Sequence, residues 1–168
     1  IGVVPNSRNA LTQLVTDVKS LEDEARDLVA RGRQKIQAKN YNEAIKLFTE
    51  VLENIDANDQ EAIFYRAISY LDQGNLQQAI SELWRVVSPV NSHAHSQSLS
   101  QRGESRMIKT DAAAKLPAPK NDQLAQQAFI LLSIAHKRLG EAQNAIQDLE
   151  RCIELYPDYP DAYLARGQ

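Results

Sequence analysis

Two histidines are the first residues of this chain whose type and spacing suggest chemistry. His93 and His95 are arranged as metal ligands can be, but no cysteine or carboxylate stands at ligand spacing beside them. A third ligand would have to be supplied by folding. We therefore predict that this pair binds no metal and that the chain uses no cofactor.

A group of serines lies in the same stretch. Ser98, Ser100 and Ser105 stand near Arg102 and Arg106 and are candidate phosphate acceptors, although a serine-rich composition is also that of a plain linker. The chain has no glycine-rich phosphate loop and no nucleophile elbow, and the sequence brings no serine, histidine and aspartate together. We predict no catalytic residue and no enzyme activity.

The remaining chemical candidate is Cys152, the one cysteine of the chain, which has no internal disulfide partner. It falls on a helical face that should pack inside the molecule, so we expect inert core filler in a reducing, cytoplasmic setting. The net charge is -3 without blocks of like charge, which excludes a typical nucleic-acid binder. The longest apolar run, Ala128 to Ala135, is too short to span a bilayer, and the N-terminus shows no secretory pattern.

A recurring pattern organises the elements that would position these residues. Between Gln126 and Tyr159, a helix-sized segment, a glycine break and a second helix-sized segment carry Phe129, Leu132, Ser133, His136, Gly140, Ala145, Leu149 and Pro157. A small residue in the first helix of each copy falls at Gly32, Ala67, Ser133 and Gly167, which are 35, 66 and 34 residues apart. The longer interval is one period with about 32 inserted residues.

These spacings resemble the tetratricopeptide repeat, in which two antiparallel helices pack closely at small residues. His136 and Lys35 stand where an aromatic residue is usual, and Asp56 departs from the closing proline. The resemblance covers roughly residues 25–87 and 123–168. It implies an all-α helical repeat, or α-solenoid, that serves as a non-catalytic scaffold and binds a peptide or helix of a partner protein.

The pattern divides the chain into four parts. Residues 1–24 extend the first helix, 25–87 form two helix pairs, 88–122 form a flexible insertion, and 123–168 form a third pair and the start of a fourth. The insertion is rich in serine, glutamine and proline and poor in large apolar residues, so we expect the fold not to need it. Because the chain starts at Ile1 and ends inside a repeat, we expect a fragment of a longer protein.

The extension carries an apolar stripe. Leu11, Leu14, Val18 and Leu21 alternate steps of three and four, in the manner of a coiled coil, and run without a breaker into the first repeat. The stripe predicts one long helix over about 7–38. Three interpretations stay open: the stripe caps the repeat core, associates with a second copy, or binds a partner helix.

The partner site is expected in the concave groove, which the first helix of each pair lines in this family. The candidates are the residues a few steps off the core stripe: Arg26, Val29, Arg33, Phe64, Ile68, Asp72, Gln127, Ile130, Ile134 and Lys137. The apolar members suggest apolar anchors, with the cations pairing with acidic residues of the partner. Alternatively, the N-terminal helix or the insertion covers the apolar members.

One variant of the family clamps the acidic tails of heat-shock chaperones with lysine, arginine and asparagine. The matching positions here are Val29, Arg33, Tyr65, Gln127 and Leu131, of which only Arg33 keeps the charge. We therefore do not expect that ligand. Three roles remain: an adaptor, a structural subunit of a larger assembly such as a ciliary, transport or cochaperone complex, and the noncatalytic domain of an enzyme.

Overall fold

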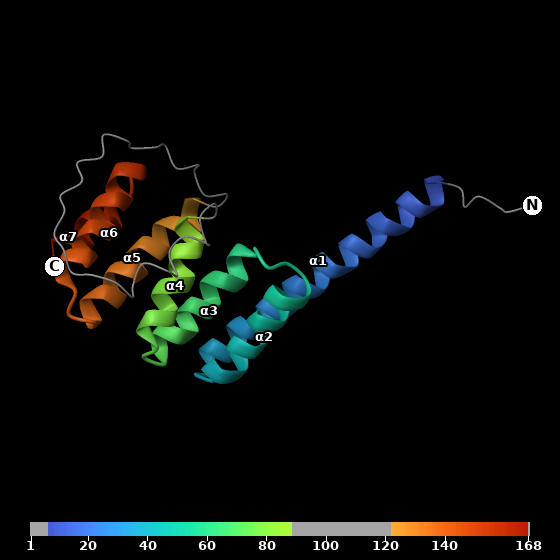
Figure 1. The fold of residues 1–168 in the computed structure, drawn as a ribbon, viewed down its shortest axis with the longest axis horizontal. Coiled ribbons are helices and arrows are strands. Elements are labelled where there is room, and N and C mark those ends of the chain that lie inside the picture. Colours follow the sequence, from blue (N-terminus) through green and yellow to red (C-terminus); the bar gives the residue numbers. More distant parts are fainter. Residues whose placement is uncertain (1–6, 89–121, 168) are drawn as a thin grey trace, which may run out of the picture.

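The computed structural model describes residues 7–88 and 122–167, and every regular element within them is an α-helix (Figure 1). The helices are α1 (Ser7–Gln37), α2 (Tyr41–Asn54), α3 (Gln60–Asp72), α4 (Leu76–Val87), α5 (Asp122–Arg138), α6 (Ala142–Leu155) and α7 (Pro160–Arg166). The expected all-α repeat fold is confirmed. His93, His95 and the serines near Arg102 lie outside the described residues, as does nearly all of the predicted insertion.

The helices stack as antiparallel pairs in chain order. Each helix packs on the next, and α5 packs on both α3 and α4, so the third pair lies directly on the second as the repeat spacing predicts. The backbones of the first helices also approach one another, α1 with α3, α3 with α5 and α5 with α7, whereas those of the described α2, α4 and α6 do not. Between α4 and α6, long side chains meet: the Arg151 guanidinium lies 5.8 Å from the centre of the Trp84 ring. The stack therefore curves with its first helices on the inner side.

The turn inside each pair uses a left-handed residue at one fixed repeat position. Lys39, Gly74 and Gly140 have φ values of 57°, 83° and 82°. Glycine adopts this conformation without a steric cost, whereas a side chain clashes with the following carbonyl. Lys39 therefore carries strain that the other two turns avoid.

Replacing this lysine should stabilise the fold. We expect Lys39→Gly to raise the free energy of unfolding by about 0.5–1 kcal/mol, because the left-handed strain disappears. Urea denaturation followed by circular dichroism measures the change. Gly74→Ala is the matched control and should destabilise the protein; two changes of the same sign would contradict this account.

The helices approach most closely at the small residue of each first helix. A Cβ atom built on Gly32 would lie 2.5 Å from Cε1 of Phe48, which is fully buried in α2. Ala67, at the equivalent position of the second pair, is also fully buried. The small residues therefore set the spacing of the two helices in each pair.

A methyl group at this contact should overpack the first pair. Gly32→Ala should lower the free energy of unfolding by about 1–3 kcal/mol, because Phe48 has to move. Gly167 occupies the same repeat position, yet its added Cβ would meet only carbonyl oxygens at 3.7 Å. Thermal unfolding should thus separate Gly32→Ala from a nearly silent Gly167→Ala, and equal effects would disprove the contact.

A nearly buried ion pair joins three helices near the middle of the stack. Nη2 of Arg66 in α3 donates to Oε1 of Glu82 in α4 at 2.7 Å, and its Nη1 donates to the Thr49 hydroxyl in α2 at 3.1 Å. Arg85 donates to the second oxygen of Glu82 at 3.1 Å. Both oxygens of the Glu82 carboxylate are thereby paired, as burial of a charge requires.

The N-terminal half of α1 projects away from the repeats (Figure 1). Residues 9–24, here called the projecting segment, are exposed along their whole length. Its stripe residues Leu11, Leu14, Val18 and Leu21 are 46% to 64% exposed. The long helix is confirmed, but the interpretation that its stripe caps the core is wrong, since α1 has 31 residues and its partner α2 only 14.

Candidate functional site

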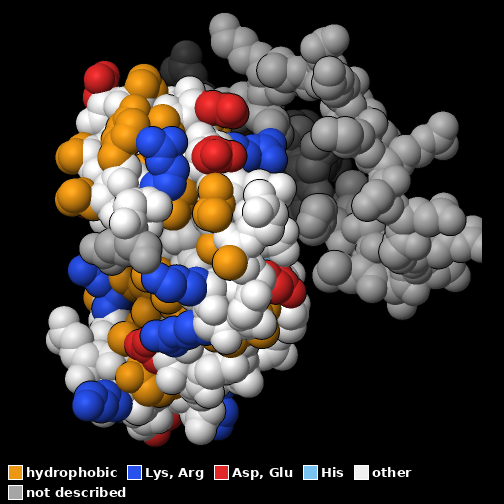
Figure 2. Space-filling model, turned by 90° about the vertical axis from the view of Figure 1, so that its left-hand side faces the viewer, with side chains coloured by type: hydrophobic (Ala, Val, Ile, Leu, Met, Phe, Trp, Pro, Cys, Tyr) orange, Lys and Arg blue, Asp and Glu red, His pale blue; other side chains and the backbone are white. Residues whose placement is uncertain are grey.

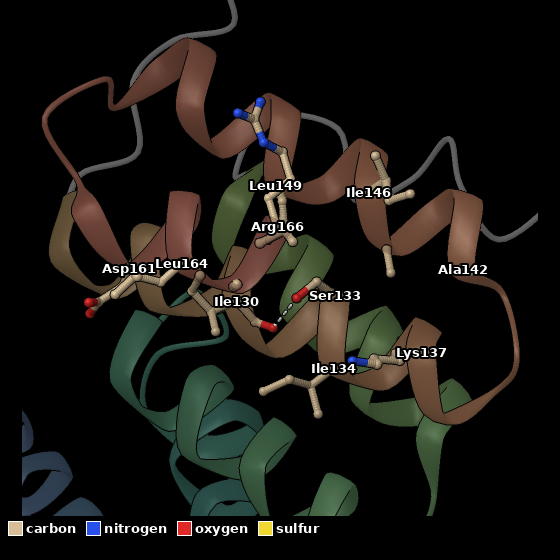
Figure 3. Close-up of a pocket in the computed structure, with 12 residues that line it drawn as sticks. Ile130, Ser133, Ile134, Lys137, Ala142, Ile146, Leu149, Asp161, Leu164 and Arg166 are labelled. Carbon is tan, nitrogen blue, oxygen red and sulfur yellow. Dashed lines mark hydrogen bonds between the residues drawn. The ribbon is translucent and has the colours of Figure 1, made fainter. Parts of the chain in front are cut away.

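An apolar pocket of about 480 Å³ lies between α5, α6 and α7. Figure 3 shows its lining from the three helices: Ile130, Ser133, Ile134 and Lys137 of α5, Ala142, Ala145, Ile146 and Leu149 of α6, and Asp161, Leu164, Ala165 and Arg166 of α7. Its volume falls within the usual range for ligand pockets. The lining is mostly aliphatic, with two cations and one carboxylate among its members.

Helix packing explains why this apolar surface stays open. Ala145 and Ser133 are buried where α5 and α6 meet, and Ser133 satisfies its hydroxyl by donating to the Ile130 carbonyl at 2.7 Å. Ile134, Ile146 and Leu164 remain 37% to 66% exposed around that contact. The large side chains thus form the walls of the pocket and the small residues its floor.

The same surface one repeat earlier is covered by a helix. Leu71, Ala79 and Ala135 form a buried cluster, against which Leu76, Ile80 and Leu131 pack. Nη1 of Arg138 also donates to the Leu71 carbonyl at 3.1 Å. The C-terminal half of α5 thereby covers residues whose counterparts, 66 positions later, are Lys137, Ala142, Ala145 and Ile146 of the pocket.

Among the described residues, no helix covers the pocket in the way that α5 covers the preceding repeat. In repeat register α7 (Pro160–Arg166) corresponds to residues 126–132, the middle of α5. The described residues include no counterpart of Ala135 or Arg138. The pocket is therefore a surface of the kind that this fold elsewhere covers with a helix.

The structure brings together three of the residues predicted for the groove. Ile130, Ile134 and Lys137 line the pocket. The sequence reasoning missed Ile146, because it considered only first helices, and it did not extend the groove to Leu164 and Arg166 of the last first helix, α7. Ile146 could have been found from the repeat register. It follows Ala145 as Ile80 follows Ala79, and Ile80 packs under α5.

Two predicted groove residues are buried instead. Val29 is 5% exposed and Phe64 is 3% exposed, and both belong to the main core. The cause is that successive first helices touch one another, so residues beside the core stripe pack into the core instead of facing an open groove. Truncating Phe64 would thus report on stability rather than on binding, which corrects its expected role as an anchor.

The other predicted residues are spread along the stack. The Arg33 guanidinium lies 4.9 Å from the centre of the Tyr65 ring, a cation–π contact between α1 and α3. Arg26 pairs with Asp23 at 3.0 Å on the exposed side of α1. Ile68 is half-buried, and Asp72 and Gln127 are exposed. None of these five lines the pocket.

A buried histidine and aspartate link α5 to α6. Nδ1 of His136 lies 2.6 Å from Oδ2 of Asp148, and both side chains are buried. Burial raises the pKa of Asp148, and the hydrogen bond and charge of His136 oppose that rise. The Ser133 hydroxyl donates to the Ile130 carbonyl and takes no part in this pair.

Repeat position explains this pair. Asp148 stands 66 residues after Glu82, so both carboxylates occupy the same place in a second helix. Glu82 pairs with Arg66, whereas Asp148 pairs with His136, which replaces the aromatic residue usual in this repeat family. The histidine is thus a structural substitute for an aromatic core residue.

Replacing one residue of the His136–Asp148 pair should lower the free energy of unfolding more than replacing both. Asp148→Leu should lower the free energy of unfolding by about 1–3 kcal/mol, because His136 loses its buried hydrogen-bond partner. His136→Phe combined with Asp148→Leu should recover most of that loss, since an apolar pair needs no hydrogen bond. Urea denaturation of both single variants and the double variant tests this; additive losses would count against the pair.

Cys152 lies in the core, as the helical pattern predicts. Its side chain is fully buried, and burial raises the pKa of its thiol to about 11. The thiol therefore stays protonated near neutral pH. Within residues 7–88 and 122–167, no cluster of His, Cys, Asp or Glu side chains could hold a metal ion, and none of the helices there is long and apolar enough to cross a membrane.

Helix pairs with small residues at each close contact define a helical-repeat protein of the tetratricopeptide type. Residues 126–159 match the family model for the tetratricopeptide repeat. The segment from the middle of α5 through α6 and the turn after it is therefore similar to a tetratricopeptide repeat. A crystal structure of MamA is similar, with a TM-score of 0.57 and 16% sequence identity over 99% of this chain and 82% of that one.

At that identity the likeness to MamA shows the fold alone. No curated protein matches the sequence. The repeat and the fold are those of protein-interaction scaffolds, which typically have no catalytic centre of their own.

Proposed function

We propose that this protein is an interaction scaffold whose α5–α6–α7 pocket receives an apolar helix of a partner protein. The observation that carries the proposal is the covering of the equivalent surface, one repeat earlier, by the C-terminal half of α5. A surface that buries Leu131 and Ala135 there is suited to a similar apolar ridge here. Helices that lay an apolar face into a groove are a common mode of recognition.

Charge refines the proposed ligand. Leu71 lies under α5, but its counterpart in the pocket is Lys137, and Arg166 adds a second cation across from Asp161. Figure 2, which looks onto the end of the stack carrying α6 and α7, shows hydrophobic side chains with both Lys or Arg and Asp or Glu side chains beside them. An apolar helix flanked by acidic residues fits this surface better than a basic one.

Capture of partners by the immobilised chain tests the proposal. The amount of partner protein retained from extracts of cells that express the protein should fall at least about tenfold with Ile134→Asp, because this variant places a charge in the apolar pocket. Leu155→Asp is the matched control, since Leu155 is 42% exposed but lies outside the pocket. If every captured protein binds Ile134→Asp as well as the wild type, the pocket is not the site.

A second function is favoured by the projecting segment. An exposed apolar stripe on a helix that leaves the repeats supports a structural subunit of a larger assembly, which would use its N-terminal helix as well as its pocket. The two functions differ in what holds the partners. Leu14→Asp should release partners of the assembly and leave partners of the pocket bound.

A further inference from the structure

The second and third helix pairs each enclose an acidic side chain at the same repeat position, and they pair it with different bases. Glu82 of α4 lies 2.7 Å from Nη2 of Arg66, and Asp148 of α6 lies 2.6 Å from Nδ1 of His136. Arginine stays charged at every pH at which proteins are folded, whereas imidazole takes up a proton near neutral pH. Of these two pairs, only the one between α5 and α6 therefore changes its charge near neutral pH.

The imidazole ring of His136 lies between two carboxylates. On its other side from Asp148, the Nε2 atom lies 3.8 Å from Oε2 of Glu141, the residue that precedes α6. An ionised carboxylate only accepts hydrogen bonds, so in the neutral ring Nδ1 carries the proton and Nε2 turns a lone pair toward Glu141. A second proton, on Nε2, converts this contact between two acceptors into an ion pair.

The other charges around this pair come from α6 and from the turn before it. Oε2 of Glu141 accepts from the Asn144 amide at 2.9 Å, which holds the carboxylate beside the ring. Burial raises the pKa of Asp148, and His136 and the positive charge of Arg151 oppose that rise. A carboxyl group whose pKa is raised by folding favours the folded state as the pH falls. From α3, α4 and α7, which also pack on α5, no described charged side chain forms an ion pair with His136 or Asp148.

We propose that His136 is a pH-sensitive link between α5 and α6, whose protonation ties Asp148 and Glu141 more firmly to α5 and stabilises the third helix pair. At neutral pH the buried pair carries the uncompensated charge of the Asp148 carboxylate, so burial favours uptake of a proton, as Glu141 does. The folded protein therefore binds this proton more tightly than the unfolded chain, and stability rises as the pH falls. The gain is complete below about pH 6.5, where the imidazole of an unfolded chain is protonated too, and it is lost as the pH rises above that value.

Urea denaturation at pH 5.5 and at pH 7.5 tests the link. As the pH falls, the folding equilibrium constant of the wild type should rise at least about threefold relative to that of the double variant His136→Phe/Asp148→Leu, which lacks the pair. Glu141→Gln should reduce the rise, because it keeps the shape of the side chain and removes the second carboxylate. Glu82→Gln is the matched control in the second helix pair and should keep the response of the wild type. The remaining histidines are common to all variants and cancel in the comparison.

Hydrogen exchange of the wild type shows where the proton acts. After correction for intrinsic exchange rates, amide protection in α6 should be higher at pH 5.5 than at pH 7.5, and it should rise more than in α4, whose acidic residue pairs with arginine. Equal changes in α6 and α4, or a pH response that the double variant shares with the wild type, would overturn the proposal. If the double variant does not fold, hydrogen exchange of the wild type and of Glu141→Gln decides the question, because an unchanged response of α6 in Glu141→Gln contradicts the link.

Discussion

The close approach of two helices at a small residue is the contact on which this structure depends. At Gly32 there is no room for one methyl group before Phe48, and at Ala67 the side chain is completely buried. This spacing lets the large side chains of the second helix reach the first helix and close the core of each pair. The pair then stacks on its neighbours as one rigid unit, which places every other surface.

A stack built from such units covers each repeat only with the next one. The apolar surface of the α3–α4 pair is covered by α5, but the corresponding surface of the α5–α6 pair is covered only in part, by the short α7. At the other end, α1 continues well past the length of α2. Within the described residues, apolar surface is therefore exposed beside α7 and along α1 beyond the length of α2.

Sequence periodicity predicted the packing within a helix pair better than the packing between pairs. The positions of Gly32, Ser133 and Cys152 follow from the repeat register, because each position has one fixed neighbour in its own pair. Val29 and Phe64 do not follow from it, since their burial depends on the angle at which successive first helices meet. That angle results from the packing of several side chains at once and leaves no periodic mark.

The pocket shows the same limit. Ile130, Ile134 and Lys137 share one helix face and could be grouped from the sequence alone. Ile146, Leu164 and Arg166 join them only because α6 and α7 turn toward α5 in the fold. The pairing of His136 with Asp148 likewise depends on two helices meeting, although the matching positions of Asp148 and Glu82 in the repeat were visible in the sequence.

Apolar burial and charge contribute differently to any contact that the pocket makes. Leucines on a helix would fill an aliphatic pocket in almost any orientation, so burial supplies affinity but little choice of partner. Charge supplies the choice, since Lys137 and Arg166 of the pocket favour an acidic helix. Because these charges lie at the solvent edge of the apolar surfaces, salt would weaken the selection of a partner while leaving the apolar contact itself intact.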